Sequence, residues 1–363
     1  MSYRESTNIL NRVRWQDQQE GTPSRTLANI VETEGNQIQK HLENTTDKIL
    51  SQHNFNQNGN IVNKKEAYGL SPSKASISKE AITEAINEYN IEVENENLKI
   101  DADVVNDFHE DSSKTINVSP DDVLVKKQKE TGRSPAKSKK EKKEFVKNTI
   151  FHIEDNEHSY CLNGSNTLQV LKRLIAFLFL NNLLTDHYLQ FFIDGERSLY
   201  KAISKMFSWL PHYRIILDWY HLQKKCKYEL SLALKGKTIR NSILSELLPI
   251  LWVGKVDDAI EYAENINPDS IKSTHNIQRL IGYFERNKEH IPCYALRKKL
   301  GLRNSSNKGE KINDLTVSDR QKENGMSWSN KGSVALATIT TLYLNNESKK
   351  WYHNEQINFK LCA

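Results

Sequence analysis

The sequence has few cysteines and no cysteine pair of the kind that binds zinc. Cys161, Cys226, Cys293 and Cys362 are scattered through the 363 residues, and no two of them form a C-x-x-C motif. This scatter argues against a structural zinc site and against a disulfide framework. We therefore expect a reducing, cytoplasmic location.

Long apolar runs and an N-terminal targeting segment are also lacking. The longest apolar run, LIAFLFL at residues 174–180, is far shorter than the roughly 20 residues needed to span a bilayer. The N-terminal stretch MSYRESTNIL contains no apolar core of the signal-peptide type. These absences predict a protein that has no membrane partner.

The net charge of +5 is unevenly distributed along the chain. Residues 1–115 carry 12 Lys+Arg and 19 Asp+Glu, a balance of −7, whereas the rest of the chain carries 39 and 27, a balance of +12. A basic region of this size suits nucleic acid as a partner. A solvated basic surface is the simpler alternative.

The most basic segment lies between residues 126 and 147. We predict DNA contacts for five of its lysines and for two basic residues that follow Glu310, namely Lys137, Lys139, Lys140, Lys142, Lys143, Arg320 and Lys322. Such side chains neutralise phosphates without reading the base sequence. For the lysines, a solvated loop is an equally good interpretation.

Hydrophobic periodicity places helices first and strands later. Helical spacing covers residues 1–52 and the segment from Ser76, which Ser78 can cap, with a linker at 53–75. The strand region TINVSPDDVLVKKQ, at 115–128, is expected to break at Pro120. The elements expected next are a hairpin turning near Asp155-Asn156, an apolar helix at 165–184, a strand ending at Asp194, an amphipathic helix at 197–207, and a strand over 214–221 that ends near Asp218.

Helical patterns then fill residues 222–300, and a further helix is expected to begin at Glu310. This order predicts an α/β, ribonuclease-H-like fold, in which a mixed sheet is flanked by helices, with an all-helical insert and a helical N-terminal region. The expected divisions are an acidic N-terminal region (1–115) for DNA-end binding or self-association, the first part of the ribonuclease-H-like domain (116–221), the insert (222–305), the closing helices (306–345) and a C-terminal tail (346–363).

Three acids occupy special places in this order. Asp121, beside Asp122, lies in the first strand, Asp194 ends a strand before Gly195, and Glu310 begins a helix. The strand ends of an α/β sheet can bring side chains to one crevice. Three convergent carboxylates suit two Mg²⁺ ions, which prefer oxygen ligands and promote phosphodiester displacement. Each acid also has an ordinary interpretation as a turn residue, a helix-start acid or a solvated side chain.

Four blocks of sequence, in this order, resemble bacterial insertion-sequence transposases of the DDE type, in the Mutator-like superfamily. They are VSPDDVLVKKQKETG from Val118, FFIDGERSLYKAISKMF from Phe191, RIILDWYHLQKKC from Arg214, and IPCYALRKKLGLRNSSNKGEKINDLTVSDRQKENGMSWSNKGSVALA from Ile291. The resemblance covers about residues 115–355. Its most specific parts are Asp-Trp-Tyr-His at 218–221 and the acid that precedes RQKENGMSWS.

The resemblance implies an enzyme that cleaves and joins double-stranded DNA with two Mg²⁺ ions, which Mn²⁺ can replace. Asp121, Asp194 and Glu310 match the catalytic and metal-binding acids, and Asp122 is an open alternative to Asp121. Asp218 and His221 match a strand-end Asp and His that support the site. The implied partners are the element ends and target DNA, with the protein assembled on them as a homo-oligomer and associated with the nucleoid.

Two other functions remain open on the sequence alone. A ribonuclease-H-like nuclease or resolvase would cut DNA without joining it, and a transposase descendant would bind DNA without catalysis. Two individual residues also allow two interpretations. Trp328 either stacks on a base or lies buried, and His221 is either a site residue or a packed residue at a strand end.

Overall fold

The computed structural model describes residues 3–14, 21–63, 68–128, 144–322 and 326–361. In these residues five strands form one mixed sheet with the order β3-β2-β1-β4-β5. β2 pairs antiparallel with both β1 and β3, and the pairs β1–β4 and β4–β5 are parallel. The strands are β1 (Thr115–Lys126), β2 (Phe145–Glu154), β3 (Ser159–Gly164), β4 (Tyr188–Ile193) and β5 (Tyr213–Leu217). The predicted mixed α/β class is therefore confirmed.

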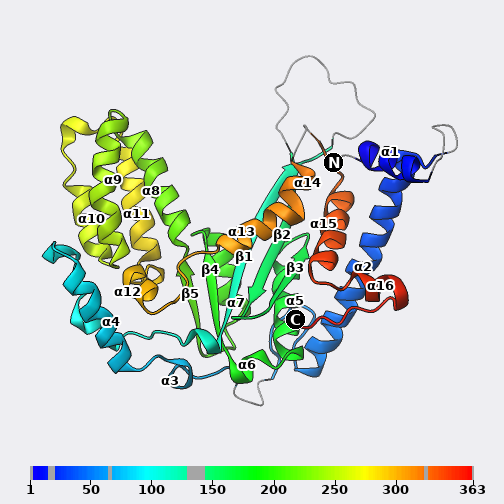
Figure 1. The fold of residues 1–363 in the computed structure, drawn as a ribbon, viewed down its shortest axis with the longest axis horizontal. Helices are drawn as coiled ribbons and strands as arrows, with labels where there is room; N and C mark the ends of the chain where they lie inside the picture. Colours follow the sequence, from blue (N-terminus) through cyan, green and yellow to red (C-terminus); the bar gives the residue numbers. More distant parts are fainter. Residues whose placement is uncertain (1–2, 15–20, 64–67, 129–143, 323–325, 362–363) are drawn as a thin grey trace.

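Helices connect the strands and continue after them (Figure 1). α5 and α6 lead from β3 to β4, and α7 leads from β4 to β5. The helices of this part are α5 (Thr167–Leu180), α6 (Leu183–Asp186), α7 (Arg197–Met206), α13 (Asn307–Asn313), the π-helical turn η6 (Asp314–Ser318), α14 (Asp319–Gln321), α15 (Asn330–Leu344) and α16 (Ser348–Asn354).

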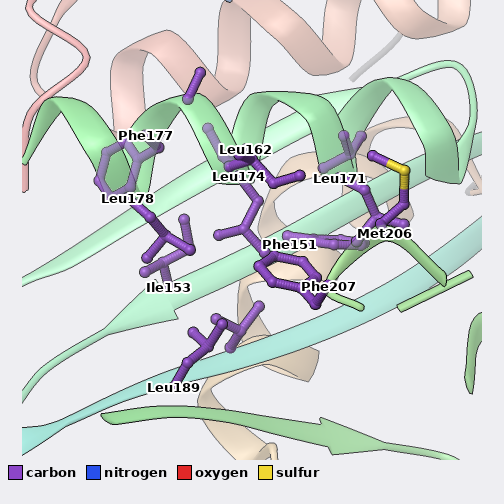
Figure 2. Close-up of a cluster of buried hydrophobic side chains, with 14 of the residues drawn as sticks. Phe151, Ile153, Leu162, Leu171, Leu174, Phe177, Leu178, Leu189, Met206 and Phe207 are labelled. Atoms are coloured by element: carbon purple, nitrogen blue, oxygen red, sulfur yellow. The ribbon is translucent and has the colours of Figure 1, made fainter. Parts of the chain in front are cut away.

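The main core lies between α5 and the sheet. α5 begins as predicted after Asn166, whose side chain accepts a hydrogen bond from the backbone N–H of Gln169 at 3.0 Å. Figure 2 shows the apolar side chain of Leu174 beside Phe151 of β2, with Phe177 further along the helix. Burying such large side chains is the dominant favourable contribution to folding.

A separate helical lobe stands beside β5 (Figure 1). One face of α8, with Leu222, Cys226 and Leu230, is buried in the core of this lobe. The prediction that residues 222–300 are helical is confirmed. The lobe comprises α8 (Trp219–Ala233), α9 (Lys237–Trp252), α10 (Val256–Glu264), η4 (Pro268–Ser270), α11 (Thr274–Asn287), η5 (Lys288–His290) and α12 (Tyr294–Lys299).

The N-terminal region packs against both the sheet domain and the lobe. α2 lies along α5 and α15, and α4 packs on α12. Ser78 caps α4 as predicted, accepting from the backbone N–H of Ala81 at 3.3 Å. The elements are α1 (Tyr3–Val13), α2 (Ser24–Gln52), α3 (Pro72–Ala75), α4 (Lys79–Glu92) and the 3₁₀ turns η1 (Glu96–Leu98), η2 (Ala102–Asn106) and η3 (Ser112–Lys114).

A buried ion pair fastens this N-terminal region to the lobe. Glu110 pairs with Arg297 of α12 at 2.6 Å and accepts a hydrogen bond from Arg214 of β5 at 3.3 Å. Burial alone would raise the pKa of Glu110, but the two guanidinium groups hold the pKa below its usual value. The carboxylate therefore stays charged inside the protein.

Three boundary predictions are wrong. β1 does not break at Pro120 but runs on to Lys126, because the pairing with β4 ends at Val118 and leaves Pro120 without a neighbouring strand on that side. β5 ends at Leu217, next to the predicted end near Asp218, but His221, expected at the strand end, lies in a helix. The helix that contains Glu310 begins earlier, at Asn307.

The described ranges contain three free thiols and no membrane-spanning helix. No helix there is long and apolar enough to cross a bilayer. Cys161, Cys226 and Cys293 are buried and free, and Cys362 lies outside the described residues.

The crossing of α2 over α15 generates a first prediction. A Cβ added at Gly35 would lie 2.5 Å from both Cα and Cβ of Ala335, so the two helices touch at this glycine. Gly35→Ala should lower the free energy of unfolding by roughly 1–3 kcal/mol, because overpacking outweighs the gain in helix propensity. Urea denaturation measures this change.

Gly282→Ala in α11 is the matched control. Its new Cβ would meet only the flexible end of Arg286, at 3.1 Å. It should therefore stabilise the protein by up to about 1 kcal/mol, as alanine does in an ordinary helix. If Gly35→Ala stabilises the protein to the same extent, then α2 is not seated on α15 as described.

Candidate active site

The first acid of the site extends from the central strand. Beyond Val118, β1 no longer pairs with β4, which leaves the β4 side of Asp121 open. Asp121 accepts hydrogen bonds from the backbone N–H of Asp122 at 2.7 Å and from the Asn313 side chain at 2.6 Å. Asp122 is engaged elsewhere, since it accepts from Thr149 at 2.5 Å and pairs with a lysine of β2.

The second acid follows β4 directly. β4 and β5 are parallel, and Ile193 pairs with Leu217, so Asp194 and Asp218 emerge at the same edge of the sheet. Gly195 then turns the chain with a φ of +85°, a conformation that favours glycine. A Cβ at Gly195 would lie 2.5 Å from the hydroxyl oxygen of Tyr283.

Asp218 joins the end of β5 to two other segments. Its side chain is 1% exposed and caps α8 by accepting from the backbone N–H of His221 at 3.0 Å. Its other oxygen accepts from the backbone N–H of Ser306 and from the Ser306 hydroxyl, the latter at 2.7 Å. One buried carboxylate thus fixes the starts of both α8 and α13.

The third acid is carried by α13. Gly309 allows this helix to approach β1, because a Cβ there would lie 2.7 Å from the Cβ of Ser119. The next residue, Glu310, places a carboxylate oxygen 3.3 Å from Nε2 of His221. The other ring nitrogen of His221, Nδ1, lies 3.3 Å from Asp218. The histidine therefore bridges the buried acid and the acid of α13.

The ionisation of these groups is mutually coupled. We define the acid cluster as Asp121, Asp194, Asp218 and Glu310 together with His221. Burial raises the pKa of Asp121, and the charge of Asp194 raises it further despite the hydrogen bond from Asp122. Burial likewise raises the pKa of Glu310. The charges of Asp218 and Asp121 raise this pKa further, and the charge of His221 lowers it.

The histidine carries the compensating charge. Burial would lower the pKa of His221, but the hydrogen bond to Asp218 and the charges of Asp218, Asp194 and Glu310 raise it above its usual value. Burial would raise the pKa of Asp218, but hydrogen bonds from His221 and Ser306 hold that pKa below its usual value. Both shifts favour the ionised pair of carboxylate and imidazolium.

Most of the predicted site residues come together, and some do not. Asp121, Asp194, Asp218, His221 and Glu310 form the acid cluster, whereas Asp122 turns to other partners. Arg320 and Lys322 are exposed beyond η6. Trp328 is buried, and its indole N–H donates to the Gln321 carbonyl at 3.0 Å. The five predicted lysines, Lys137, Lys139, Lys140, Lys142 and Lys143, lie outside the described residues.

Two supporting residues were not assigned such roles from the sequence. Asn313 lies three residues after Glu310, a spacing that puts both on one face of α13 and signals a shared site. Ser306 gave no signal, because its contact with Asp218 spans 88 residues. The π-helical turn that follows α13 was also missed, although such turns often lie at functional sites.

A comparison with known families assigns the chain to one of them. The model of the uncharacterised protein family UPF0236 matches residues 59–355. The chain belongs to this family. The UPF0236 match includes all five described strands, the lobe and every residue of the acid cluster, while α1 and α2 precede it. A search of curated proteins finds no match.

The contacts of Asp218 generate a second prediction. Asp218→Asn removes the charge that holds His221 and Ser306, and should lower the free energy of unfolding by about 2–4 kcal/mol. The pKa of His221 should fall, which an NMR titration of the imidazole protons would show. Asp257→Asn is the control, because Asp257 is an exposed acid whose ion pair with Lys288 is on the surface.

The stability difference between wild type and Asp218→Asn should depend on pH. The stabilisation from protonated His221 is complete below its usual pKa of 6.5 and is lost as pH rises through the raised value. The stabilisation from Asp218 is present above its usual pKa of 3.8 and is lost as pH falls through the lowered value. The difference should therefore be largest between pH 3.8 and 6.5. A difference that stays constant from pH 3 to pH 9 would contradict this coupling.

Proposed function

We propose that the chain is a DDE-type DNA transposase, which cuts the ends of an insertion sequence and joins them to target DNA. The observation that carries the proposal is the acid cluster. Asp121, Asp194 and Glu310 come from three separate elements. The charge of Asp194 raises the pKa of Asp121, and the charge of Asp121 raises the pKa of Glu310. Such a gathering of like charges is costly unless it serves a cationic ligand.

The topology of the sheet supports the same proposal. An antiparallel β1–β2–β3 unit, extended in parallel by β4 and β5, is the arrangement expected of a ribonuclease-H-like domain. One acid lies on the central strand β1, one follows β4, and one lies on a helix that packs against β1 after the helical insert. This is the order of acids in the resemblance to DDE transposases.

The residues of the acid cluster fit hard divalent cations. They supply carboxylate oxygens, which Mg²⁺ and Mn²⁺ prefer. Asp194 is exposed, and the Glu310 side chain is 40% exposed, so both can be reached from solvent. Among the described residues no three His, Cys, Asp or Glu side chains are close enough to hold one ion as they stand. In this arrangement His221 contacts the carboxylate of Glu310, and the Asn313 side chain donates a hydrogen bond to Asp121.

Asp121, Asp194 and Glu310 are the residues that would hold the ions. Two bound Mg²⁺ ions supply activation of the attacking oxygen and stabilisation of the leaving oxygen in phosphodiester displacement. Asn313 orients Asp121 through its side-chain hydrogen bond. His221 offsets the negative charge of the cluster and, anchored on Asp218, sets the position of Glu310.

In the proposed reaction, the nucleophile changes between the two steps. During cleavage a water oxygen bonds to phosphorus as the bond from phosphorus to the 3′ oxygen breaks, which leaves a 3′-hydroxyl end. During joining that 3′-hydroxyl oxygen attacks a target phosphate and displaces its 3′ oxygen. We propose element ends and target DNA as partners, with a homo-oligomer assembled on them. A strand-transfer assay with a pre-cut 3′-hydroxyl end separates this function from that of a nuclease, which would only cut.

A third prediction concerns the three acids. Asp121→Asn, Asp194→Asn and Glu310→Gln should each slow cleavage and joining by at least about 100-fold, since even groups outside a metal's ligand shell cost about 10–100-fold when removed. DNA binding should remain, because phosphate contacts lie mainly elsewhere. Rates are measured on labelled element-end DNA with Mg²⁺.

Two neighbouring acids provide matched controls. Asp122→Asn removes a carboxylate that is engaged by Thr149 and a lysine, and Glu196→Gln removes an exposed carboxylate beside Asp194. Both variants should cut and join within a few-fold of wild type. If Glu310→Gln is as active as these controls, Glu310 is an ordinary helix acid and the three-carboxylate assignment is wrong.

A fourth prediction concerns ion binding by the folded protein. Mg²⁺ at 100 times its dissociation constant should raise the free energy of unfolding by about 2.7 kcal/mol, because the ion binds only the native state. Thermal melting with and without Mg²⁺ measures the gain. Glu310→Gln should gain much less than Glu196→Gln. Equal gains in both variants would place the ion somewhere else.

A further inference from the structure

α8 carries an exposed aromatic and basic stripe. Tyr220, Lys224 and Tyr228 recur every four residues, which aligns them on one side of the helix. Tyr220 is 44% exposed, Tyr228 is 56% exposed, and Lys224 is also exposed. These three residues, called here the α8 stripe, lie opposite the face of α8 that is buried in the lobe.

The lysine of the stripe has a ring neighbour and, within the described residues, no ion pair. Lys224 lies over the ring of Tyr220, with its nitrogen 5.7 Å from the ring centroid. Lys225, next to the stripe, is bound by the buried Glu229 at 2.8 Å. In the described part of the chain no carboxylate forms an ion pair with Lys224 or with the exposed Lys227. The surface therefore combines open aromatic rings with free positive charge.

The stripe begins at the acid cluster. Tyr220 directly precedes His221, which contacts Glu310. Lys224 follows one turn further along the same side of α8. Figure 1 shows α8 running from the region of α13 and β5 out along the helical lobe.

We propose that the α8 stripe binds a DNA strand with unpaired bases next to the acid cluster. Stacking on aromatic rings and phosphate contacts with lysines are the two interactions that single strands use, and they tolerate any base sequence. Tyr220 and Tyr228 are separated by about 12 Å along the helix axis, from eight residues at 1.5 Å each, so a few nucleotides reach both. Paired bases are stacked inside a duplex, and their faces are hidden from exposed rings.

This inference names a partner for the surface beside the proposed site and so rests on the proposed function. DNA cut at an element end has to present its strand to the acids, and a frayed end supplies unpaired bases there. The stripe would then hold the strand while the acids of α13, β1 and β4 meet its phosphate.

The test is binding of a fluorescent single-stranded oligonucleotide, followed by anisotropy. Measurements use the full chain with Glu310→Gln and no divalent ion, so that no cutting occurs. Tyr220→Ala and Tyr228→Ala should each weaken binding by about fivefold or more, the loss expected for one stacked base. Tyr220→Phe should bind as the parent does, because its ring is retained. Lys224→Gln should reduce the log–log salt slope by about 0.7.

Matched controls come from α16, away from the lobe. Tyr352→Ala removes a tyrosine that is 61% exposed, and Lys349→Gln removes an exposed lysine. Both should bind the oligonucleotide as the parent does, and thermal melting of every variant verifies that it is folded. The stripe proposal is overturned if Tyr220→Ala and Tyr228→Ala bind like Tyr352→Ala. It is also overturned if they weaken blunt duplex binding as much as single-strand binding, because stacking would then not be the mode.

Failure of this proposal can be told apart from failure of the proposed function. If Glu310→Gln still cuts DNA, the catalytic assignment is wrong, whatever the stripe binds. If the tyrosine variants bind normally while Glu310→Gln is inactive, the acid cluster is retained and the stripe is not its strand-binding surface.

Discussion

The buried carboxylate of Asp218 is the interaction on which the geometry of the site depends. It ends a parallel strand, caps α8, holds the segment that starts α13 through Ser306, and contacts His221. Each of these bonds satisfies a charge that is otherwise costly to bury. Because α13 carries Glu310 and α8 carries His221, the position of one acid determines how the lobe, the sheet and α13 meet.

Contacts distant from the site reinforce this arrangement. The hydroxyl of Tyr294 donates to the Leu217 carbonyl at 2.7 Å, which ties α12 to the end of β5. Glu110 of the N-terminal region pairs with Arg297 of α12 and Arg214 of β5. The lobe is therefore fastened to the sheet from two sides. The surface on α8 and the acids at the strand ends are thereby held in a fixed relation.

The sequence predicted the helices and strands better than it predicted the boundaries between them. Apolar runs such as LIAFLFL and the alternation in β2 and β3 are local signals, and they correctly placed α5 and the hairpin. Pro120 caused the wrong prediction of a break in β1. A strand tolerates proline where no neighbouring strand pairs with it, and no local sequence pattern shows where such pairing ends. The end of β5 was placed correctly near Asp218, but His221 was assigned to the strand end because Trp219 and Tyr220 are residues that also suit strands.

The acids of the site were anticipated for a different reason. Asp121, Asp194 and Glu310 lie at element positions that the order of strands and helices brings to one edge. Which of Asp121 and Asp122 faces the other acids could be seen only in the structure, because adjacent strand residues face opposite sides and only the pairing register decides which side is occupied. Ser306 and Gly309 required the tertiary fold, since their partners Asp218 and Ser119 are far away in the sequence.

The central claim is that Asp121, Asp194 and Glu310 jointly hold divalent cations. Its most direct test is anomalous X-ray diffraction from crystals of the protein bound to element-end DNA and soaked in Mn²⁺. The account predicts anomalous density enclosed by these three carboxylates and a DNA phosphate, with His221 displaced from Glu310. Mn²⁺ bound only outside this group of acids, with His221 still on Glu310, would contradict it.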